Sequence, residues 1–132
     1  MISGQTNIEQ FIPQRPPFVF IDRVDAVSAD ATCTRYTIPA DGVLVSEDVL
    51  PLAGLMENAA QTCAVRAGNK IGYIGAVKQM AVTRLPRVGE TLVTEARVVQ
   101  QVLNICLMEV TTRIGDEQIA TTTLKIATME NE

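Results

Sequence analysis

The sequence contains no histidine, and this absence narrows the chemistry of the protein more than any other. Histidine is the side chain best suited to acid–base work near neutral pH and the commonest protein ligand of metals. The three cysteines, Cys33, Cys63 and Cys106, are odd in number and widely spaced, which fits neither a disulfide framework nor paired metal ligands. We therefore expect buried cysteine side chains, and neither a metal nor another cofactor.

Three further absences limit the location and the partners. No apolar run reaches the roughly 20 residues needed to span a bilayer. The first residues lack the basic start and apolar core of a secretory signal. The 132 residues carry a net charge of −4 and no basic run, which argues against nucleic-acid binding. We expect a cytoplasmic protein with one domain spanning residues 1–132, which binds neither nucleic acid nor a membrane.

One stretch, Pro51 to Gly68, is the only long segment that predicts a helix, with Gly68 as its C-cap. It is apolar almost all the way round, so we expect the rest of the chain to cover it. Its broadest apolar face comprises Leu52, Leu55, Met56, Ala59, Ala60, Cys63 and Ala67. Glu57 and Gln61 are four residues apart and share the other side. A carboxylate in a mostly buried helix is costly unless it is paired or used, which makes Glu57 the first functional candidate.

The remaining chain predicts a short helix and six strands. The short helix begins at Thr6 or Asn7 and ends at Phe11 or Ile12, before Pro13. Alternating apolar residues and turn signals predict the strands. Their expected ranges are 18–27, 31–39, 71–85, 91–103, 105–114 and 118–129. An antiparallel β-sheet wrapped around one long central α-helix, an α+β fold, satisfies this order of elements.

Two motifs point to a known family: IPQRPPFVFIDRV at residues 12–24 and LMENAAQ at residues 55–61. They resemble the hotdog-fold 3-hydroxyacyl-acyl-carrier-protein dehydratases. That family has an N-terminal signature close to L-P-H-R-x-P-F-L-L-x-D-R-V, and a catalytic acid in an E-x-x-A-Q context on its central helix. Residues 73–92 are similar to the family's strand that ends in a V-x-P-G-D-x-L turn. The resemblance implies the hotdog fold.

The resemblance also suggests roles for single residues. Glu57 falls on the family's catalytic acid and Gln61 on the glutamine one helical turn later. Leu52 stands where the family has a glycine whose backbone N–H polarises the thioester carbonyl. The family's catalytic histidine lies in a G-H-F-P-G motif fourteen residues before the acid. Here that segment begins Gly42-Val43, and Val43 cannot transfer a proton.

This combination is most similar to the ApeP-like branch, which is associated with aryl-polyene pathways and expected beside a second hotdog protein. In the family, the histidine and the acid of one site come from different subunits. The resemblance thus implies a homodimer, or a heterodimer in which Glu57 serves a site with a partner's histidine. It implies a 3-hydroxyacyl thioester on acyl carrier protein or coenzyme A as the substrate, in fatty-acid or polyene-type biosynthesis. Burial disfavours the ionised form of Glu57, which suits a general acid.

Two other functions stay open at this point. An acyl thioesterase would use Glu57, Gln61 and Thr62 with a water molecule, and a non-catalytic acyl-thioester-binding or scaffold subunit would keep Glu57 as a structural group. Arg84 and Arg87 flank Leu85-Pro86 and are candidates for binding a phosphopantetheine phosphate or an acidic carrier protein. Solvated turn arginines are the simpler interpretation of the same pair.

Overall fold

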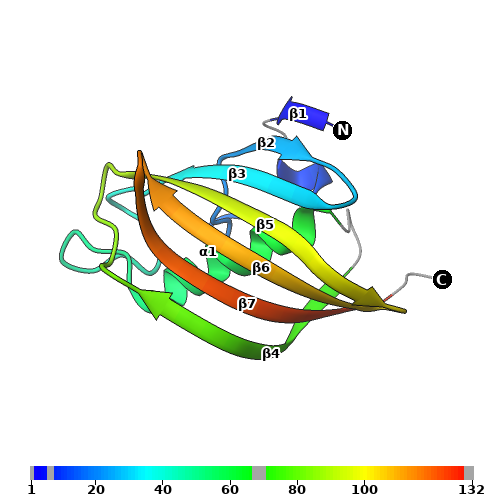
Figure 1. Ribbon diagram of the computed structural model, residues 1–132. Helices are drawn as coiled ribbons and strands as arrows, with labels where there is room; N and C mark the ends of the chain where they lie inside the picture. Colours follow the sequence, from blue (N-terminus) through cyan, green and yellow to red (C-terminus); the bar gives the residue numbers. More distant parts are fainter. Residues whose placement is uncertain (1, 6–7, 67–70, 130–132) are drawn as a thin grey trace.

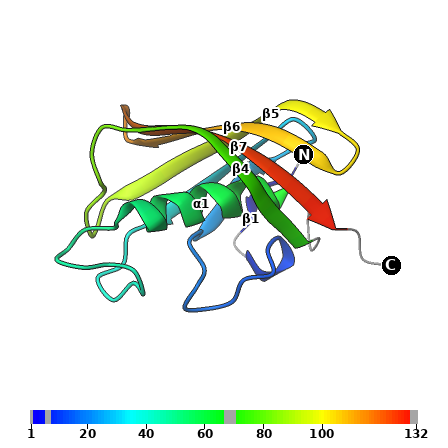
Figure 2. The same ribbon diagram turned by 90° about the horizontal axis from the view of Figure 1, so that it is seen from below.

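A single sheet and one long helix make up the fold. The computed structural model describes residues 2–5, 8–66 and 71–129. Seven strands form one antiparallel sheet in the order β1-β2-β3-β5-β6-β7-β4. The helix α1 (Leu52–Val65) lies against one face of this curved sheet (Figures 1 and 2). The predicted α+β architecture, an antiparallel sheet around one central helix, is confirmed.

Long antiparallel hairpins build most of the sheet. Its strands are β1 (Ile2–Gln5), β2 (Arg23–Val27), β3 (Ala31–Thr37), β4 (Ile71–Val82), β5 (Thr91–Val102), β6 (Ile105–Ile114) and β7 (Glu117–Met129). From β5 onward the predicted and observed bounds agree within one residue. Gly115, with φ of 58°, adopts the left-handed conformation in the tight turn between β6 and β7. β4 and β1 form the two edges of the sheet.

Helix α1 is rich in leucine, alanine and methionine, which favour helix. It begins after Pro51, which acts as N-cap without a side-chain hydrogen bond, and it ends at Val65 with Arg66 as C-cap. Gly68, the predicted C-cap, lies outside the described residues. At Gly54 an added Cβ would lie 2.3 Å from Cδ1 of Leu50, so glycine lets Leu50 pack tightly against the first turn. No helix in the described part of the chain is long and apolar enough to cross a membrane.

The N-terminal predictions need correction. The strand expected at residues 18–27 begins only at Arg23, and β1 was not expected at all. Of the short helix, the structure shows a 3₁₀ turn at Ile8–Gln10, and the expected caps Thr6 and Asn7 lie outside the described residues. Residues 18–20 are not paired as a strand because side chains of α1 form hydrogen bonds with their backbone groups, including the N–H of Phe20.

The largest correction concerns how much of α1 the rest of the chain covers. Leu55, Ala59 and Cys63 are buried in the core beneath the sheet. Leu52, however, is 50% exposed, and Glu57 is exposed as well. The sheet curves around only one side of the helix, so the opposite side stays open (Figure 2). The expectation that Glu57 is a buried charge is therefore wrong for the single chain.

The cysteines follow the sequence-based expectation more closely. Cys63 and Cys106 are buried, Cys33 is half-buried, and all three are free thiols. Burial raises the pKa of the Cys63 thiol to about 12, so this thiol is neutral and unreactive at physiological pH. These side chains serve as small core residues.

Candidate functional site

Glu57 and Gln61 lie together on α1, one helical turn apart. The Nε2 group of Gln61 is 3.4 Å from Oε2 of Glu57 and donates a long hydrogen bond to it. Gln61 is almost completely buried, whereas Glu57 is exposed. The carboxylate thus sits at the border between the core and the open side of the helix, held from below by a neutral amide. Among residues 2–5, 8–66 and 71–129, Gln61 is the one side chain that donates a hydrogen bond to this carboxylate.

The other contacts of Gln61 show that it holds a neighbouring segment in place. Its Oε1 accepts a hydrogen bond of 2.7 Å from the backbone N–H of Phe20, and its Nε2 donates one of 2.9 Å to the carbonyl of Phe18. Both ends of the amide are therefore engaged with the segment before β2. Gln61 was predicted as a catalytic residue. In the structure its amide bonds this segment at both ends and meets Glu57 through the long hydrogen bond alone.

Asn58 strengthens the same attachment from the sheet side. Its Nδ2 donates to the carbonyl of Phe20 at 2.8 Å, and its Oδ1 accepts from the hydroxyl of Thr94 on β5 at 2.7 Å. Asn58 and Thr94 are fully buried. The amide therefore satisfies polar groups on both sides within the core, as buried polar groups must be.

Thr62 is not brought to the site. Its hydroxyl donates to the carbonyl of Asn58 at 2.7 Å and shares a hydrogen bond of 2.8 Å with the hydroxyl of Thr34 on β3. The residue is fully buried against the sheet. The structure therefore separates Thr62 from the open side that carries Glu57, which removes it from the predicted substrate-binding and thioesterase set.

Leu52 and Val43 mark the approach to the first turn of α1. Leu52 begins the helix, where the first backbone N–H groups have no intrahelical partner and the helix dipole is positive. Val43 lies in the segment between β3 and α1 and is 44% exposed. This segment is held by bridges that join Val49 to Ser46 and to Arg87. A valine at this exposed position offers no proton-transfer group.

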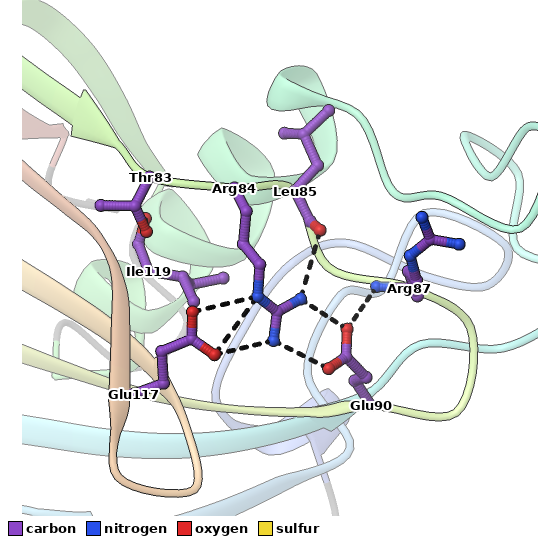
Figure 3. A network of polar contacts seen from close by, with 7 residues as sticks. All are labelled: Thr83, Arg84, Leu85, Arg87, Glu90, Glu117 and Ile119. Carbon is purple, nitrogen blue, oxygen red and sulfur yellow. Dashed lines mark hydrogen bonds and ion pairs between the residues drawn. The ribbon is translucent and has the colours of Figure 1, made fainter.

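Arg84 and Arg87 have different surroundings, as Figure 3 shows. The guanidinium of Arg84 forms two hydrogen bonds of 2.9 Å with the carboxylate of Glu90 and also binds Glu117 at 3.1 Å. Arg84 was a candidate for binding a phosphate or an acidic carrier protein, and in the structure two carboxylates already hold it. Arg87 is exposed, and it contacts Glu90 through its backbone N–H while its side chain points away (Figure 3).

This ionic cluster joins the turn before β5 to the start of β7. The hydrogen bonds from Arg84 and from the backbone of Arg87 lower the pKa of Glu90 to about 2. The carboxylate stays ionised through the whole physiological range. The arrangement is suited to fixing the turn, and it leaves Arg87 as the freer of the two predicted cations.

Phe18 is a further candidate residue that the sequence-based reasoning did not name. It was assigned to a strand, but its side chain is 58% exposed and its carbonyl binds Gln61, the neighbour of Glu57. A large aromatic side chain exposed beside a candidate acid is a natural ligand-contact surface. The signal was present in Pro16-Pro17 directly before it, since prolines disfavour regular strand pairing.

Comparison with known proteins tests the resemblance noted above. The family model for ApeP-like proteins, described as ApeP dehydratase, matches residues 6–132. The chain belongs to the ApeP-like dehydratase family. A 3-hydroxyacyl-acyl-carrier-protein dehydratase FabZ from Lactiplantibacillus plantarum is 27% identical over 131 residues, covering 90% of this chain and 89% of the relative. The FabZ protein of Levilactobacillus brevis is 28% identical over 123 residues, covering 84% of this chain and 83% of the relative.

Solved structures show the same hotdog fold. The dehydratase heterocomplex ApeI:P from Xenorhabdus doucetiae contains a chain that matches with a TM-score of 0.85 at 17% identity, covering 94% of this chain and 91% of that one. A hypothetical thioesterase with coenzyme A from Streptococcus pneumoniae matches with a TM-score of 0.68 at 12% identity, covering 83% of this chain and 86% of that one. The ApeP-like family therefore shares its architecture with proteins described as dehydratases and as thioesterases.

Proposed function

We propose that this chain is the histidine-lacking subunit of a composite hotdog dehydratase that acts on 3-hydroxyacyl thioesters. The observation that carries this proposal is the position of Glu57. The carboxylate is exposed on the open side of α1 and supported by Gln61, in a chain that contains no histidine. One of the two groups needed for the reaction is thus presented outward, and the other has to come from elsewhere.

The chemistry explains why two groups are needed. Dehydration removes a proton from the α-carbon and expels the β-hydroxyl as water, so a base takes one proton and an acid supplies another. We assign the acid to Glu57 and the base to a histidine of the partner subunit. The first backbone N–H groups of α1, at Leu52, orient and polarise the thioester carbonyl, which promotes loss of the α-proton.

The open side of α1 supports the presence of a partner. Leu52 is half-exposed in the single chain, and on the edge strand β4 Ile74 and Val77 are 40% and 46% exposed. Apolar surface and an unpaired strand edge of this kind favour association of two subunits. A partner that covers this side would shield Glu57 from bulk water. The heterocomplex of ApeI:P supports a second hotdog protein as the partner over a second copy of this chain.

The substrate carrier follows from the relatives. The FabZ proteins are named for acyl carrier protein, and we propose the same carrier here, within cytoplasmic fatty-acid or aryl-polyene biosynthesis. Arg87 is the better candidate for the phosphate of the carrier arm, because Glu90 and Glu117 already occupy Arg84.

The test is a complementation assay. The partner is a hotdog dehydratase that keeps the G-H-F-P-G histidine but has its own helix acid replaced by glutamine. We expect this partner alone and our chain alone to be inactive on a 3-hydroxyacyl thioester, and the mixture to form the unsaturated product. Glu57→Gln in our chain should lower kcat of the mixture by about 10²–10⁴-fold.

The matched control is Glu109→Gln, the same substitution at an exposed glutamate on β6. It should leave the activity of the mixture unchanged. Size-exclusion chromatography verifies that both variants still form the complex. A mixture whose activity does not depend on Glu57, although the complex forms, would contradict the shared site and favour a scaffold role.

Thioester hydrolysis is the competing outcome. It predicts release of free thiol from acyl-coenzyme A by the chain alone, again dependent on Glu57. The geometry supports it less well, because the hydroxyl of Thr62 is bonded within the core and both ends of the Gln61 amide hold the segment before β2.

A further inference from the structure

A groove crosses the face of the sheet that points away from α1, the face turned to the viewer in Figure 1. Its volume is about 260 Å³. The groove spans four adjacent strands, β4, β7, β6 and β5. The lining residues are Lys78, Gln100, Val102, Ile105, Leu107 and Lys125. Because the sheet separates this groove from Glu57, it is independent of the proposed dehydratase site.

One half of the groove is positively charged. The sequence has only three lysines, and two of them, Lys78 and Lys125, line this groove. No carboxylate belongs to the lining, and neither ammonium group pairs with an acidic side chain among residues 2–5, 8–66 and 71–129. In a chain of net charge −4, this is a local cationic site. An anion bound here would complement both charges.

The other half is aliphatic. Leu107 on β6 lies directly between Lys125 on β7 and Gln100 on β5, and the next pair toward the hairpin tip is Ile105 with Val102. These apolar side chains lie on the solvent side of the sheet. The apolar surface continues to Leu103, which is 90% exposed at the tip with φ of 54°, where glycine or asparagine is the usual residue. The fold itself gains little from an aliphatic surface at this place.

We propose that this groove binds an anionic amphiphile, namely a carboxylate with an aliphatic chain of medium length. The carboxylate lies between Lys78 and Lys125, and the chain runs over Leu107 toward Val102. Two strand spacings separate β7 from β5, about 10 Å, which suits such a chain. The small volume favours a single ligand molecule over a protein segment, and the net negative charge of the protein disfavours adsorption to an anionic membrane.

Decanoate is the probe that tests the site, with binding followed by methyl NMR and isothermal titration calorimetry. We expect saturable shifts at the methyl groups of Val102, Ile105 and Leu107. The double variant Lys78→Gln/Lys125→Gln should weaken binding at least tenfold, and decan-1-ol should bind more weakly than decanoate. The matched control is Arg113→Gln, which removes an exposed cation on the neighbouring strand β6, outside the groove.

Several results would overturn the site. These are the absence of saturable shifts, an affinity that the lysine variants leave unchanged, and shifts confined to α1. Capture by phosphatidylglycerol vesicles without binding of free decanoate would show that a membrane occupies this face instead. Loss of an oligomer in the lysine variants would assign the face to a second copy. The complementation assay uses the chain with both lysines in place, so its failure and a failure here are distinguishable.

Discussion

The two sides of α1 differ in burial, and the difference does not follow from whether the residues are polar or apolar. The covered sides of α1 bury Asn58 and Thr62 against the sheet and Gln61 against the segment before β2, while the open side exposes Leu52. On the buried side every polar group has a partner that holds another segment in place. On the open side Leu52 and Glu57 are exposed, and the hydrogen bond that the described residues give Glu57 is the long one from Gln61. The comparison shows that the buried side builds the fold and that the open side is available for function.

Two leucines three residues apart test this comparison most strongly. Leu55→Ala removes a fully buried side chain and should lower the free energy of unfolding by about 2–5 kcal/mol. Leu52→Ala, on the open side, should change it by no more than about 0.5 kcal/mol. Urea denaturation of the isolated chain measures both values. Equal losses would mean that α1 is covered on both sides, and the same Leu52 variant should weaken assembly with the partner.

Glu57 and Gln61 provide the next test. Gln61→Ala leaves the N–H of Phe20 and the carbonyl of Phe18 without partners and should cost about 1–3 kcal/mol of stability. Glu57→Gln keeps the shape of an exposed side chain and should alter stability by about 0.5 kcal/mol or less. Thermal or urea unfolding compares the two variants. A strongly destabilising Glu57→Gln would show that the carboxylate has a structural role instead of a catalytic one.

The smallest expected effect is on how the stability of the fold depends on pH. Gln61 makes its two shorter hydrogen bonds, of 2.7 and 2.9 Å, with neutral backbone groups, and it meets the carboxylate of Glu57 only through a long bond of 3.4 Å. The destabilisation by Gln61→Ala should therefore change little between pH 6 and pH 3. The Arg84 cluster should behave differently, because the folded pKa of Glu90, about 2, lies below its ordinary value of 4.5. A lowered pKa stabilises the fold above pH 4.5, and this contribution is lost as the pH falls toward 2.

The variant Arg84→Gln makes that effect measurable. It should destabilise the protein at pH 6, and the difference from the wild type should shrink between pH 4.5 and pH 2. Denaturation curves collected across this range are the measurement. A difference that stays constant with pH would show that the hydrogen bonds to Glu90 and Glu117 add nothing beyond neutral contacts.

The sequence predicted the C-terminal half of the fold well, because the signals for these strands lie within short stretches of the chain. Alternating residues and tight turns, such as the one at Gly115, specify β5, β6 and β7 within short windows. The N-terminal region depends on distant partners. β1 pairs Ile2 with Val27, and Phe20 binds Gln61, 41 residues away. No local pattern carries such information, so β1 was missed and β2 was predicted to begin too early, at residue 18 instead of Arg23.

Some features of the candidate site can likewise be predicted from the sequence, and others appear only in the folded chain. The motif around Glu57 and the absence of histidine are visible in the sequence, and so is the position of Val43. The engagement of Arg84 by Glu90 and Glu117 is not, because β7 approaches the turn only in the folded chain. Likewise, Phe18 becomes a candidate residue only because Gln61 and Asn58 hold its segment against the helix.

By itself, the sequence determined that one apolar helix and an antiparallel sheet form the core, because periodicity and turn residues act locally. It also determined that the chain brings no histidine to its chemistry. Only the tertiary structure decided which side of α1 is buried. A helix that is apolar on nearly every side has little orientation of its own, so distant hydrogen-bond partners and the curvature of the sheet set it. That choice leaves Glu57 facing outward.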